Sequence, residues 1–310
     1  MKILCITPVK HINGVCEILE SYGEVVYIEE ANFSQARHAL TNSDFDVIYV
    51  NPNELTFRLD AKLLNNTSIK AISTASTGTN HIDLDYCEHE NITVLSLTKE
   101  YNIITKISST AEHAFALMMA ILRNIPRAFE DAKQRNWNYR PHIGRQLNYL
   151  TIGIIGYGRL GTMMAAYCKA FGMNVLVCDP YKEARGHTHV TLAEALEQCD
   201  IISLHVHLNN ETKYMIDKYI LDNAKNGIFF INTSRGEIVN EPDMIDAIRD
   251  GKVAGYATDV ICDEFGSVDN SKLLDASESL NIIVTPHIAG MTKEAQEIAY
   301  GHAANRIAEL

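Results

Sequence analysis

Three side chains that could act together in chemistry follow the last strand-like runs of the sequence: Arg235, Glu264 and His287. In an open parallel sheet the carboxyl ends of the strands share one edge, so these side chains are expected to converge. A guanidinium binds a carboxylate through paired hydrogen bonds and polarises an adjacent carbonyl group. An imidazole exchanges a proton near neutral pH, and a neighbouring carboxylate orients the ring. The set suits interconversion of a 2-keto and a 2-hydroxy acid.

Each of these residues alone also has an ordinary structural explanation. An arginine after a strand is commonly a surface charge, and a loop glutamate is commonly solvated. A histidine after a proline is often a loop residue whose hydrogen bonds are satisfied. Only the convergence of all three at one sheet edge favours a catalytic interpretation.

A glycine-rich turn provides a candidate cofactor site. It follows the strand-like run 151–155 and precedes a helical run, as dinucleotide binding requires. Asp179 ends the next strand-like run, about 20 residues further on, where a carboxylate can bind the ribose hydroxyls and repel a 2′-phosphate. NAD is therefore predicted, and the alternative is an ordinary turn beside a solvated aspartate. The residues of the GxGxxG run are Gly156, Tyr157, Gly158, Arg159, Leu160 and Gly161.

Two blocks of alternating strand-like and helix-like segments position these residues, and they predict two doubly wound α/β domains with parallel sheets. Capping-box patterns at Ser109 with Glu112 and at Thr191 with Glu194 predict helix starts. Residues 113–122 are apolar almost all round and predict a buried helix. The expected strands are 2–7, 24–28, 46–50, 70–74, 92–95, 151–155, 174–178, 201–206, 228–232, 254–259 and 281–285; 135–148 reads as a connector and 292–310 as a final helix.

Composition excludes several classes of function. The 310 residues carry a formal net charge of −12, which argues against nucleic acid as the main partner. Seven cysteines at irregular spacing, without a CxxC pair, predict reduced thiols and no metal site. No apolar run reaches the length of a membrane span, and the short apolar run after Met1 predicts a strand, so a cytoplasmic location is expected.

Taken together, the chain resembles the D-isomer-specific 2-hydroxyacid dehydrogenase family. The resemblance covers most of the chain, from the small-residue loop around Gly78 to Thr285-Pro286-His287. It rests on the helix after Glu112, the GxGxxG run, Asp179, Ser203-Leu204-His205-Val206, the segment 232–236, Asp259-Val260 and Glu264.

The resemblance implies roles for individual residues. Arg235 would clamp the substrate carboxylate, His287 would be the acid/base, and Glu264 its partner. Backbone groups of Thr77 and Gly78 would also bind the substrate; from the residues alone, that loop is an anion nest or an ordinary turn. The NAD site implied comprises the GxGxxG run with Asp179, His205, Thr233, Ser234, Asp259 and His287.

The resemblance also implies an architecture. A Rossmann cofactor domain, residues 100–288, would be inserted into a flavodoxin-like substrate domain formed by residues 1–99 and 289–310. A homodimer joined through the cofactor domain is expected.

Some residues depart from the family's pattern. Phe265 stands where proline usually follows the glutamate, His207 replaces another common proline, and Tyr149-Leu150 replace a common Gly-Lys. Thr74 stands where phosphoglycerate dehydrogenases tend to place an arginine near the substrate phosphate, although Arg58 or another cation could substitute.

Three alternatives to a dehydrogenase of small 2-hydroxy acids stay open. The first is an enzyme of the phosphoglycerate dehydrogenase type. The second is a non-enzymatic NAD sensor like the corepressors that share the fold. The third is another Rossmann enzyme, related to formate dehydrogenase or to S-adenosylhomocysteine-type enzymes.

Overall fold

The structure is a computed structural model that describes residues 1–262, 264 and 268–310. Phe265, one of the departures from the family pattern, lies outside the described residues. The chain forms two compact units, which are described separately below. The first comprises Met1–Ile107 and Gly290–Leu310, and the second Ser108–Ala289.

The first unit contains a five-stranded parallel sheet in the order β2-β1-β3-β4-β5. This is the order of flavodoxin-like sheets, in agreement with the predicted fold class. Each strand is a short apolar or β-branched run, and the central strands β3 and β4 are buried throughout, as expected of a sheet covered on both faces. The strands are β1 (Lys2–Cys5), β2 (Glu24–Tyr27), β3 (Val47–Val50), β4 (Ala71–Thr74) and β5 (Thr93–Leu95).

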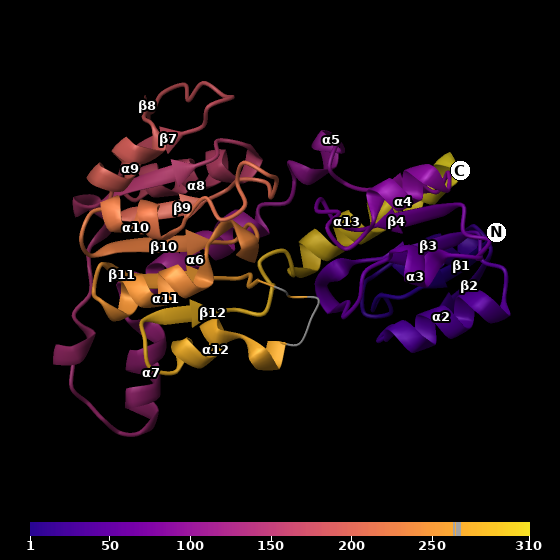
Figure 1. The fold of residues 1–310 in the computed structure, drawn as a ribbon, viewed down its shortest axis with the longest axis horizontal. Coiled ribbons are helices and arrows are strands. Elements are labelled where there is room, and N and C mark those ends of the chain that lie inside the picture. Colours follow the sequence, from indigo (N-terminus) through magenta and orange to yellow (C-terminus); the bar gives the residue numbers. More distant parts are fainter. Residues whose placement is uncertain (263, 265–267) are drawn as a thin grey trace. The chain divides into compact units, whose positions relative to one another are not determined.

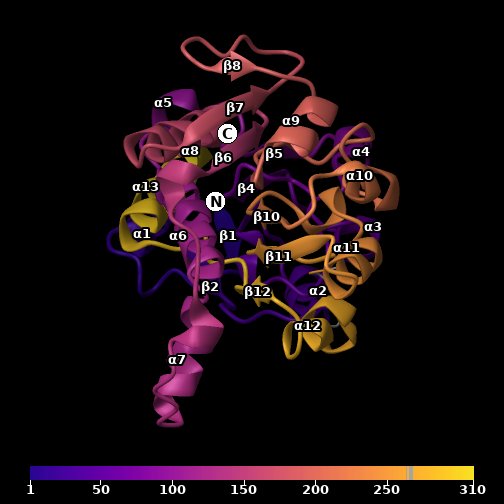
Figure 2. The same cartoon turned by 90° about the vertical axis from the view of Figure 1, so that its left-hand side faces the viewer.

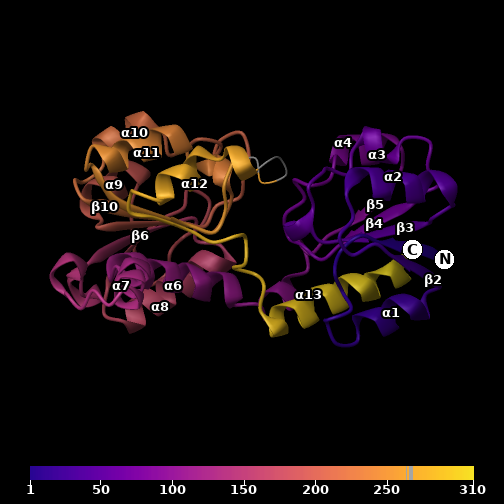
Figure 3. The ribbon, with the colours of Figure 1, turned by 90° about the horizontal axis from the view of Figure 1, so that it is seen from below.

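Helices cover both faces of this sheet. Figure 3 shows α1 and α13 on one face, with α2, α3 and α4 on the other. The C-terminal helix α13 is tied to the sheet by two buried hydrogen bonds: the Tyr49 hydroxyl donates to the Tyr300 carbonyl and the Ser73 hydroxyl to the Ala303 carbonyl, both at 2.7 Å. The helices are α1 (Val15–Ser21), α2 (Phe33–Asn42), α3 (Ala61–Leu64), α4 (Leu84–His89), α5 (Tyr101–Ile104) and α13 (Lys293–Asn305), with 3₁₀ turns η1 (Pro52–Glu54) and η6 (Arg306–Glu309).

The first unit extends further along the chain than the family resemblance implies. The predicted break lies between residues 99 and 100, whereas the unit continues to Ile107. The reason is helix α5, whose Ile104 is buried in the same apolar cluster as Tyr300. Beside it, His302 Nε2 lies 3.0 Å from a carboxylate oxygen of Glu100.

The second unit contains a seven-stranded parallel sheet in the order β12-β11-β10-β9-β6-β7-β8 (Figure 1). The order reverses beside β6, which pairs with β9 on one side and β7 on the other. All eleven strands predicted for the chain agree with the observed bounds to within two residues at each end, and β8 was not predicted. The strands are β6 (Thr151–Ile155), β7 (Asn174–Cys178), β8 (Thr188–His189), β9 (Ile201–Leu204), β10 (Ile228–Asn232), β11 (Val253–Thr258) and β12 (Ile282–Val284).

Two apolar clusters, one on each face, hold the helices of this unit to its sheet. The helices α6 and α8 lie on one face and α9 to α12 on the other (Figure 3). None of the helices in the described residues is both long and apolar enough to cross a membrane. The helices are α6 (Ser109–Leu122), α7 (Ile125–Lys133), α8 (Arg159–Ala170), α9 (Leu192–Gln198), α10 (Lys218–Asn223), α11 (Glu241–Arg249) and α12 (Lys272–Ser277), with 3₁₀ turns η2 (Arg140–His142), η3 (Leu147–Tyr149), η4 (Gly236–Ile238) and η5 (Val268–Asn270).

The two predicted capping boxes have different outcomes. The box at Thr191 and Glu194 is confirmed, with both reciprocal hydrogen bonds present. The box at Ser109 and Glu112 is wrong, because Ser108 is the N-cap of α6 and its hydroxyl, not that of Ser109, donates to the Glu112 carboxylate at 2.5 Å. The helix therefore starts one residue earlier than a box with Ser109 as its N-cap requires.

Candidate functional site

The glycine-rich turn connects β6 to α8 and needs glycine at two points for different reasons. Gly156 has a φ of +89°, in the left-handed region, and a Cβ there would contact the His205 carbonyl. A Cβ on Gly161 would collide with the carbonyl of Gly156. By contrast, a Cβ on Gly158 would meet no atom within 4 Å, so the backbone there faces open space.

This open space lies at the N-terminus of α8. Gly158 is the N-cap residue and makes no side-chain capping bond, and Arg159 and Leu160 begin the helix. The first amides of a helix point outward along a favourable dipole and form a site for phosphate groups. The turn therefore has the form that a bound pyrophosphate requires.

Asp179 follows β7 and holds the turn in place. One carboxylate oxygen accepts the amide of Tyr157 at 2.7 Å and the other accepts that of Tyr181 at 2.9 Å. A carboxylate oxygen can accept more than one hydrogen bond, so the group retains capacity for ribose hydroxyls. Asp179 thus supports the conformation of the glycine-rich turn, in addition to the role that the sequence suggests.

His205 follows β9, next to the turn. Its Nε2 lies 2.8 Å from the hydroxyl of Ser203, and burial lowers the pKa of His205 to about 4. The ring is therefore neutral at physiological pH. Its Nδ1 is buried and has no hydrogen-bond partner among the described residues.

Thr233 and Ser234 begin the loop after β10. The Ser234 hydroxyl donates to the carbonyl of Leu204, and its amide donates to the Asn232 side chain. The Thr233 hydroxyl is buried without a hydrogen bond to the residues that the structure describes. The loop is thereby fixed against the carboxyl end of β9, at the same edge as the glycine-rich turn.

Arg235 follows in the same loop. Its guanidinium donates to the carbonyl of Ser234 at 2.6 Å. Burial lowers the pKa of Arg235, while the nearby carboxylates of Glu264 and Glu237 oppose that shift. An arginine starts from so high a pKa that it stays protonated at neutral pH. The next residue, Gly236, is packed so closely that a Cβ would collide with the Ile261 backbone.

Glu264 and His287 form the closest polar contact of the site. A carboxylate oxygen of Glu264 lies 2.7 Å from His287 Nδ1, and the other accepts the amide of Ile261 at 3.1 Å. His287 has a φ of +52°, which is uncommon outside glycine. Since Glu264 also acts on Arg235 through its charge, the three residues that the sequence singles out lie together.

Asp259 explains how His287 keeps this conformation. Its side chain is 1% exposed. Its carboxylate accepts the Thr285 hydroxyl at 2.5 Å and the amides of Ile288 and Ala289 at 2.9 and 2.8 Å. Burial raises the pKa of Asp259, but hydrogen bonds, first from His113 and then from Thr285, outweigh burial and leave that pKa below its usual value.

Sequence reasoning missed two contributors to this arrangement. His113 in α6 contacts both Thr285 and Asp259, at 3.0 and 3.4 Å, although no spacing in the sequence links these positions. Gly236 belongs to the segment 232–236, on which the family resemblance rests. Its close packing against the Ile261 backbone was not predicted, because that packing depends on how close two loops lie in the folded chain. The directly observed role of Asp259 is to hold the chain on both sides of His287.

Thr77 and Gly78 lie in the first unit, in the loop after β4. The amide of Gly78 donates to the Ser76 hydroxyl at 3.1 Å, and the Thr77 carbonyl accepts the Thr98 hydroxyl at 2.6 Å. The loop is thus held by its own hydrogen bonds. An anion would have to replace Ser76 as the acceptor for the Gly78 amide.

Comparison with known proteins identifies the family. Residues 115–289 match the model of the NAD binding domain of the D-isomer specific 2-hydroxyacid dehydrogenases. The chain is 30% identical to a hydroxypyruvate reductase of Blautia hydrogenotrophica over 303 residues, 94% of this chain and 90% of that protein. The chain belongs to the D-isomer specific 2-hydroxyacid dehydrogenase family. The second unit is therefore its NAD-binding domain.

Other members of the D-isomer specific 2-hydroxyacid dehydrogenase family differ in length. A D-3-phosphoglycerate dehydrogenase of Bacillus subtilis is 36% identical over 290 residues, 92% of this chain but 52% of that protein. The chain thus spans about half the length of this relative. The crystal structure of a D-lactate dehydrogenase from Aquifex aeolicus, complexed with NAD and lactic acid, superposes with a TM-score of 0.84 at 28% identity, covering 99% of this chain and 94% of that one.

We predict that Asp259→Asn lowers the free energy of unfolding by about 2–4 kcal/mol at pH 7, because an amide cannot accept all the hydrogen bonds that reach the carboxylate. A lowered folded-state pKa stabilises the fold above the unfolded value, near 4, and that contribution is lost as pH falls through the folded value. The deficit of the variant should therefore shrink below pH 4. Urea titrations from pH 7 to pH 3 measure it.

The control for this experiment is Glu197→Gln, which alters an exposed carboxylate of the same unit. It should unfold like the wild type at every pH. If Asp259→Asn lowers the free energy of unfolding by the same amount at every pH down to 3, the charge of the Asp259 carboxylate is not what holds the segment around His287.

Proposed function

We propose that the chain is a cytoplasmic NAD-dependent dehydrogenase that interconverts a small 2-keto acid and the corresponding D-2-hydroxy acid. The observation that carries this proposal is the Glu264–His287 contact of 2.7 Å beside Arg235, at the carboxyl edge of the NAD-binding sheet. The names of the hydroxypyruvate reductase and D-lactate dehydrogenase relatives support it.

Arg235 would hold the substrate. Its guanidinium is protonated and presents donors in a planar fork, which matches a carboxylate and the oxygen of the adjacent keto group. Partial burial strengthens this attraction, because less water screens it. We also propose that backbone groups of Thr77 and Gly78, in the first unit, bind the substrate.

His287 would transfer the proton. With Nδ1 engaged by Glu264, we assign the transfer to Nε2, which would protonate the carbonyl oxygen during reduction and remove the hydroxyl proton during oxidation. Glu264 keeps the ring oriented through its contact with Nδ1. Hydrogen bonds to Asp259 hold the backbone next to His287, whose φ is +52°. The ring therefore loses little conformational freedom when it takes the position in which it transfers the proton.

The residues of the second unit fit NAD. The amides at Gly158 and the start of α8 would hold the pyrophosphate, and Asp179 the adenosine ribose. His205, Thr233, Ser234, Asp259 and His287 follow strands at the same edge. When bound, NADH supplies the hydride that reduces the keto carbon. The GxGxxG residues Gly156, Tyr157, Arg159, Leu160 and Gly161 shape the turn.

We predict that Arg235→Ala lowers kcat/KM for 2-keto acids by about 10³-fold or more, the loss expected when one partner of a buried charge pair is removed. The dissociation constant of NADH should change less than threefold. NADH oxidation with glyoxylate, pyruvate and hydroxypyruvate measures the first quantity, and NADH fluorescence the second.

Arg249→Ala removes an exposed arginine of the same unit and should behave like the wild type. An Arg235→Ala variant that keeps its activity would remove Arg235 from the mechanism. Equal loss of NADH affinity and turnover would assign it to the cofactor instead.

A second prediction concerns the glycine-rich turn. Gly158→Ala should fold normally, because φ is −72° and a Cβ meets no atom, but should bind NADH at least about tenfold more weakly, since the methyl group occupies the approach of the phosphates. In contrast, Gly161→Ala should lower Tm, because its Cβ collides with the Gly156 carbonyl. Unchanged NADH affinity of a folded Gly158→Ala variant would place the pyrophosphate elsewhere.

We also propose that the protein is a homodimer joined through the NAD-binding unit. Helix α7 buries none of its residues, and Figure 2 shows it extending away from the rest of its unit. Phe129 is 61% and Trp137 93% exposed. Such a concentration of exposed apolar surface is typical of an interface.

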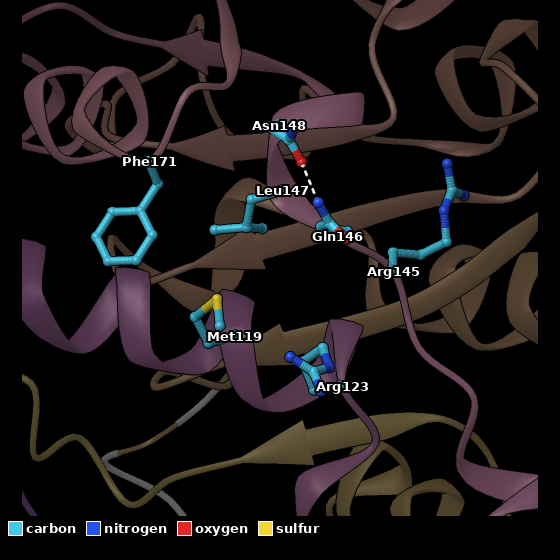
Figure 4. Close-up of a pocket in the computed structure, with 7 residues that line it drawn as sticks. All are labelled: Met119, Arg123, Arg145, Gln146, Leu147, Asn148 and Phe171. Atoms are coloured by element: carbon cyan, nitrogen blue, oxygen red, sulfur yellow. Dashed lines mark hydrogen bonds between the residues drawn. The ribbon is translucent and has the colours of Figure 1, made fainter.

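A pocket beside this segment supports the same interpretation (Figure 4). It measures about 240 Å³ and lies between the ends of α6 and α8 and the segment 145–148. Phe171 and Leu147 line one side, with the guanidinium groups of Arg123 and Arg145 on the other. In a dimer, an aromatic side chain of the second copy would cover the apolar side of this pocket. Carboxylates of that second copy would pair with Arg123 and Arg145.

We predict that Phe129→Asp converts the dimer to a monomer or weakens its association at least about a hundredfold, because a carboxylate would be buried in an apolar contact. Sedimentation velocity over a concentration series measures the change. Tyr219→Asp, at an aromatic residue of α10 that is 74% exposed, is the matched control and should leave the assembly intact. A wild type that sediments as a monomer at micromolar concentration overturns the proposal.

A further inference from the structure

His113 is a largely buried histidine to which the proposed chemistry assigns no role. It lies in the second turn of α6, and its side chain is 21% exposed. Its Nε2 lies 3.0 Å from the hydroxyl oxygen of Thr285 and 3.4 Å from a carboxylate oxygen of Asp259. All three residues belong to the second unit, so these contacts lie within one compact body.

The direction of these hydrogen bonds follows from the chemistry of Thr285. A threonine hydroxyl has one proton, and Thr285 donates it to the Asp259 carboxylate at 2.5 Å. Toward His113, the Thr285 oxygen can therefore only accept. The Asp259 carboxylate, whose pKa is lowered, also only accepts at neutral pH. Nε2 of His113 must therefore carry a hydrogen and act as the donor.

This donor matters because Asp259 is a buried charge. Burial raises the pKa of Asp259, and the hydrogen bond from His113 is the largest of the contributions that bring this pKa below its usual value. A buried carboxylate that loses a donor is left with an unsatisfied charge, which its surroundings can relieve only by shifting. His113 therefore helps to keep the Asp259 side chain in place.

The same two partners of His113 hold the backbone of His287. The amide of His287 donates to the carbonyl of Asp259 at 3.0 Å and to the carbonyl of Thr285 at 2.9 Å. The Asp259 carboxylate also accepts the amide of Ile288 at 2.9 Å. A displacement of Asp259 or Thr285 would therefore move the imidazole of His287.

Helix α6 gives His113 a firm base. Met118 and Ile121 of this helix are buried in the apolar cluster that also contains Ile152 of β6. Because closely packed interiors resist displacement, the helix fixes the position of the His113 ring relative to the sheet. The ring is thus a fixed point against which the segment 285–289 is held.

We propose that His113 is a positioning residue for the dehydrogenase reaction, which places the imidazole of His287 by donating from Nε2 to its two partners; this rests on the proposed function. The position of a proton-transferring group affects the rate steeply, since a displacement of about 1 Å can cost roughly a hundredfold. Arg235 follows a different strand, β10, and should still hold the substrate carboxylate. Loss of the His113 donor should therefore lower kcat much more than it raises KM.

Two substitutions separate the hydrogen bond from the packing of the ring. His113→Leu fills much of the same volume without a donor, whereas the side-chain amide in His113→Gln can place an N–H where Nε2 lies. With glyoxylate, pyruvate or hydroxypyruvate, His113→Leu should lower kcat about tenfold or more and change KM and the NADH dissociation constant less than about threefold. His113→Gln should restore kcat to within about threefold of the wild type.

The matched control is His142→Leu. It removes another largely buried histidine of the same unit, whose Nε2 lies 2.9 Å from a carboxylate oxygen of Asp131. Its kcat should stay within about twofold of the wild type, because the two sites share no partners. If His113→Leu does not fold, His113→Asn replaces it in both comparisons, since its amide is too short by one methylene group to reach the position of Nε2.

Two outcomes would overturn the inference while leaving the dehydrogenase proposal intact. One is a folded His113→Leu variant with the kcat of the wild type. The other is a His113→Gln variant that is no more active than His113→Leu, because the hydrogen bond would then not be what matters.

If the wild type reduces none of these acids, the dehydrogenase proposal fails, and the position of the His287 ring is then measured directly. The NMR signal of its Cε1 carbon, assigned by its loss in His287→Gln, reports on the surroundings of the ring. The signal should shift in His113→Leu and keep its wild-type position in His113→Gln and His142→Leu. A signal that does not move in His113→Leu rejects the positioning role.

Discussion

The geometry of the proposed active site depends on one buried charge, the carboxylate of Asp259. Burial of a carboxylate is unfavourable unless hydrogen bonds compensate for the lost water. Here the donors are the Thr285 hydroxyl and the amides of Ile288 and Ala289, with His113 nearby. These donors come from the chain on both sides of His287, so satisfying the charge also determines where the imidazole lies. The conformation of the histidine is thus set by β11 and α6 as well as by β12, which precedes it.

The second constraint is electrostatic. The chain carries a net charge of −12, yet the proposed substrate is an anion. Arg235 provides local attraction, because its partly buried guanidinium is screened less than a surface charge would be. Glu264 lies close enough to stabilise both this guanidinium and the imidazole of His287. One carboxylate therefore contacts the imidazole and also acts on the guanidinium through its charge.

Local signals in the sequence predicted much of this structure. Short β-branched runs predicted the bounds of the strands closely, because strands with both faces covered contain almost only apolar residues. The glycine spacing predicted the turn after β6, because steric conflict at Gly156 and Gly161 excludes other residues. Features that depend on contacts distant in the sequence were not predicted. The two-residue strand β8 has no pattern of its own, helix α7 lacks a buried face, and His113 meets Asp259 only in the folded chain. The extent of the first unit was also missed, since α5 belongs there through its packing with α13.

The close packing at Gly236 has a mechanical consequence. The backbone that follows Arg235 touches the backbone of Ile261, and Ile261 in turn donates its amide to Glu264. Two loops from neighbouring strands are thereby joined into one body without a side chain between them, and neither loop can shift alone without breaking backbone contact. Thermal fluctuation of the sheet edge would carry the guanidinium and the carboxylate together, so their separation is preserved even when their absolute positions vary.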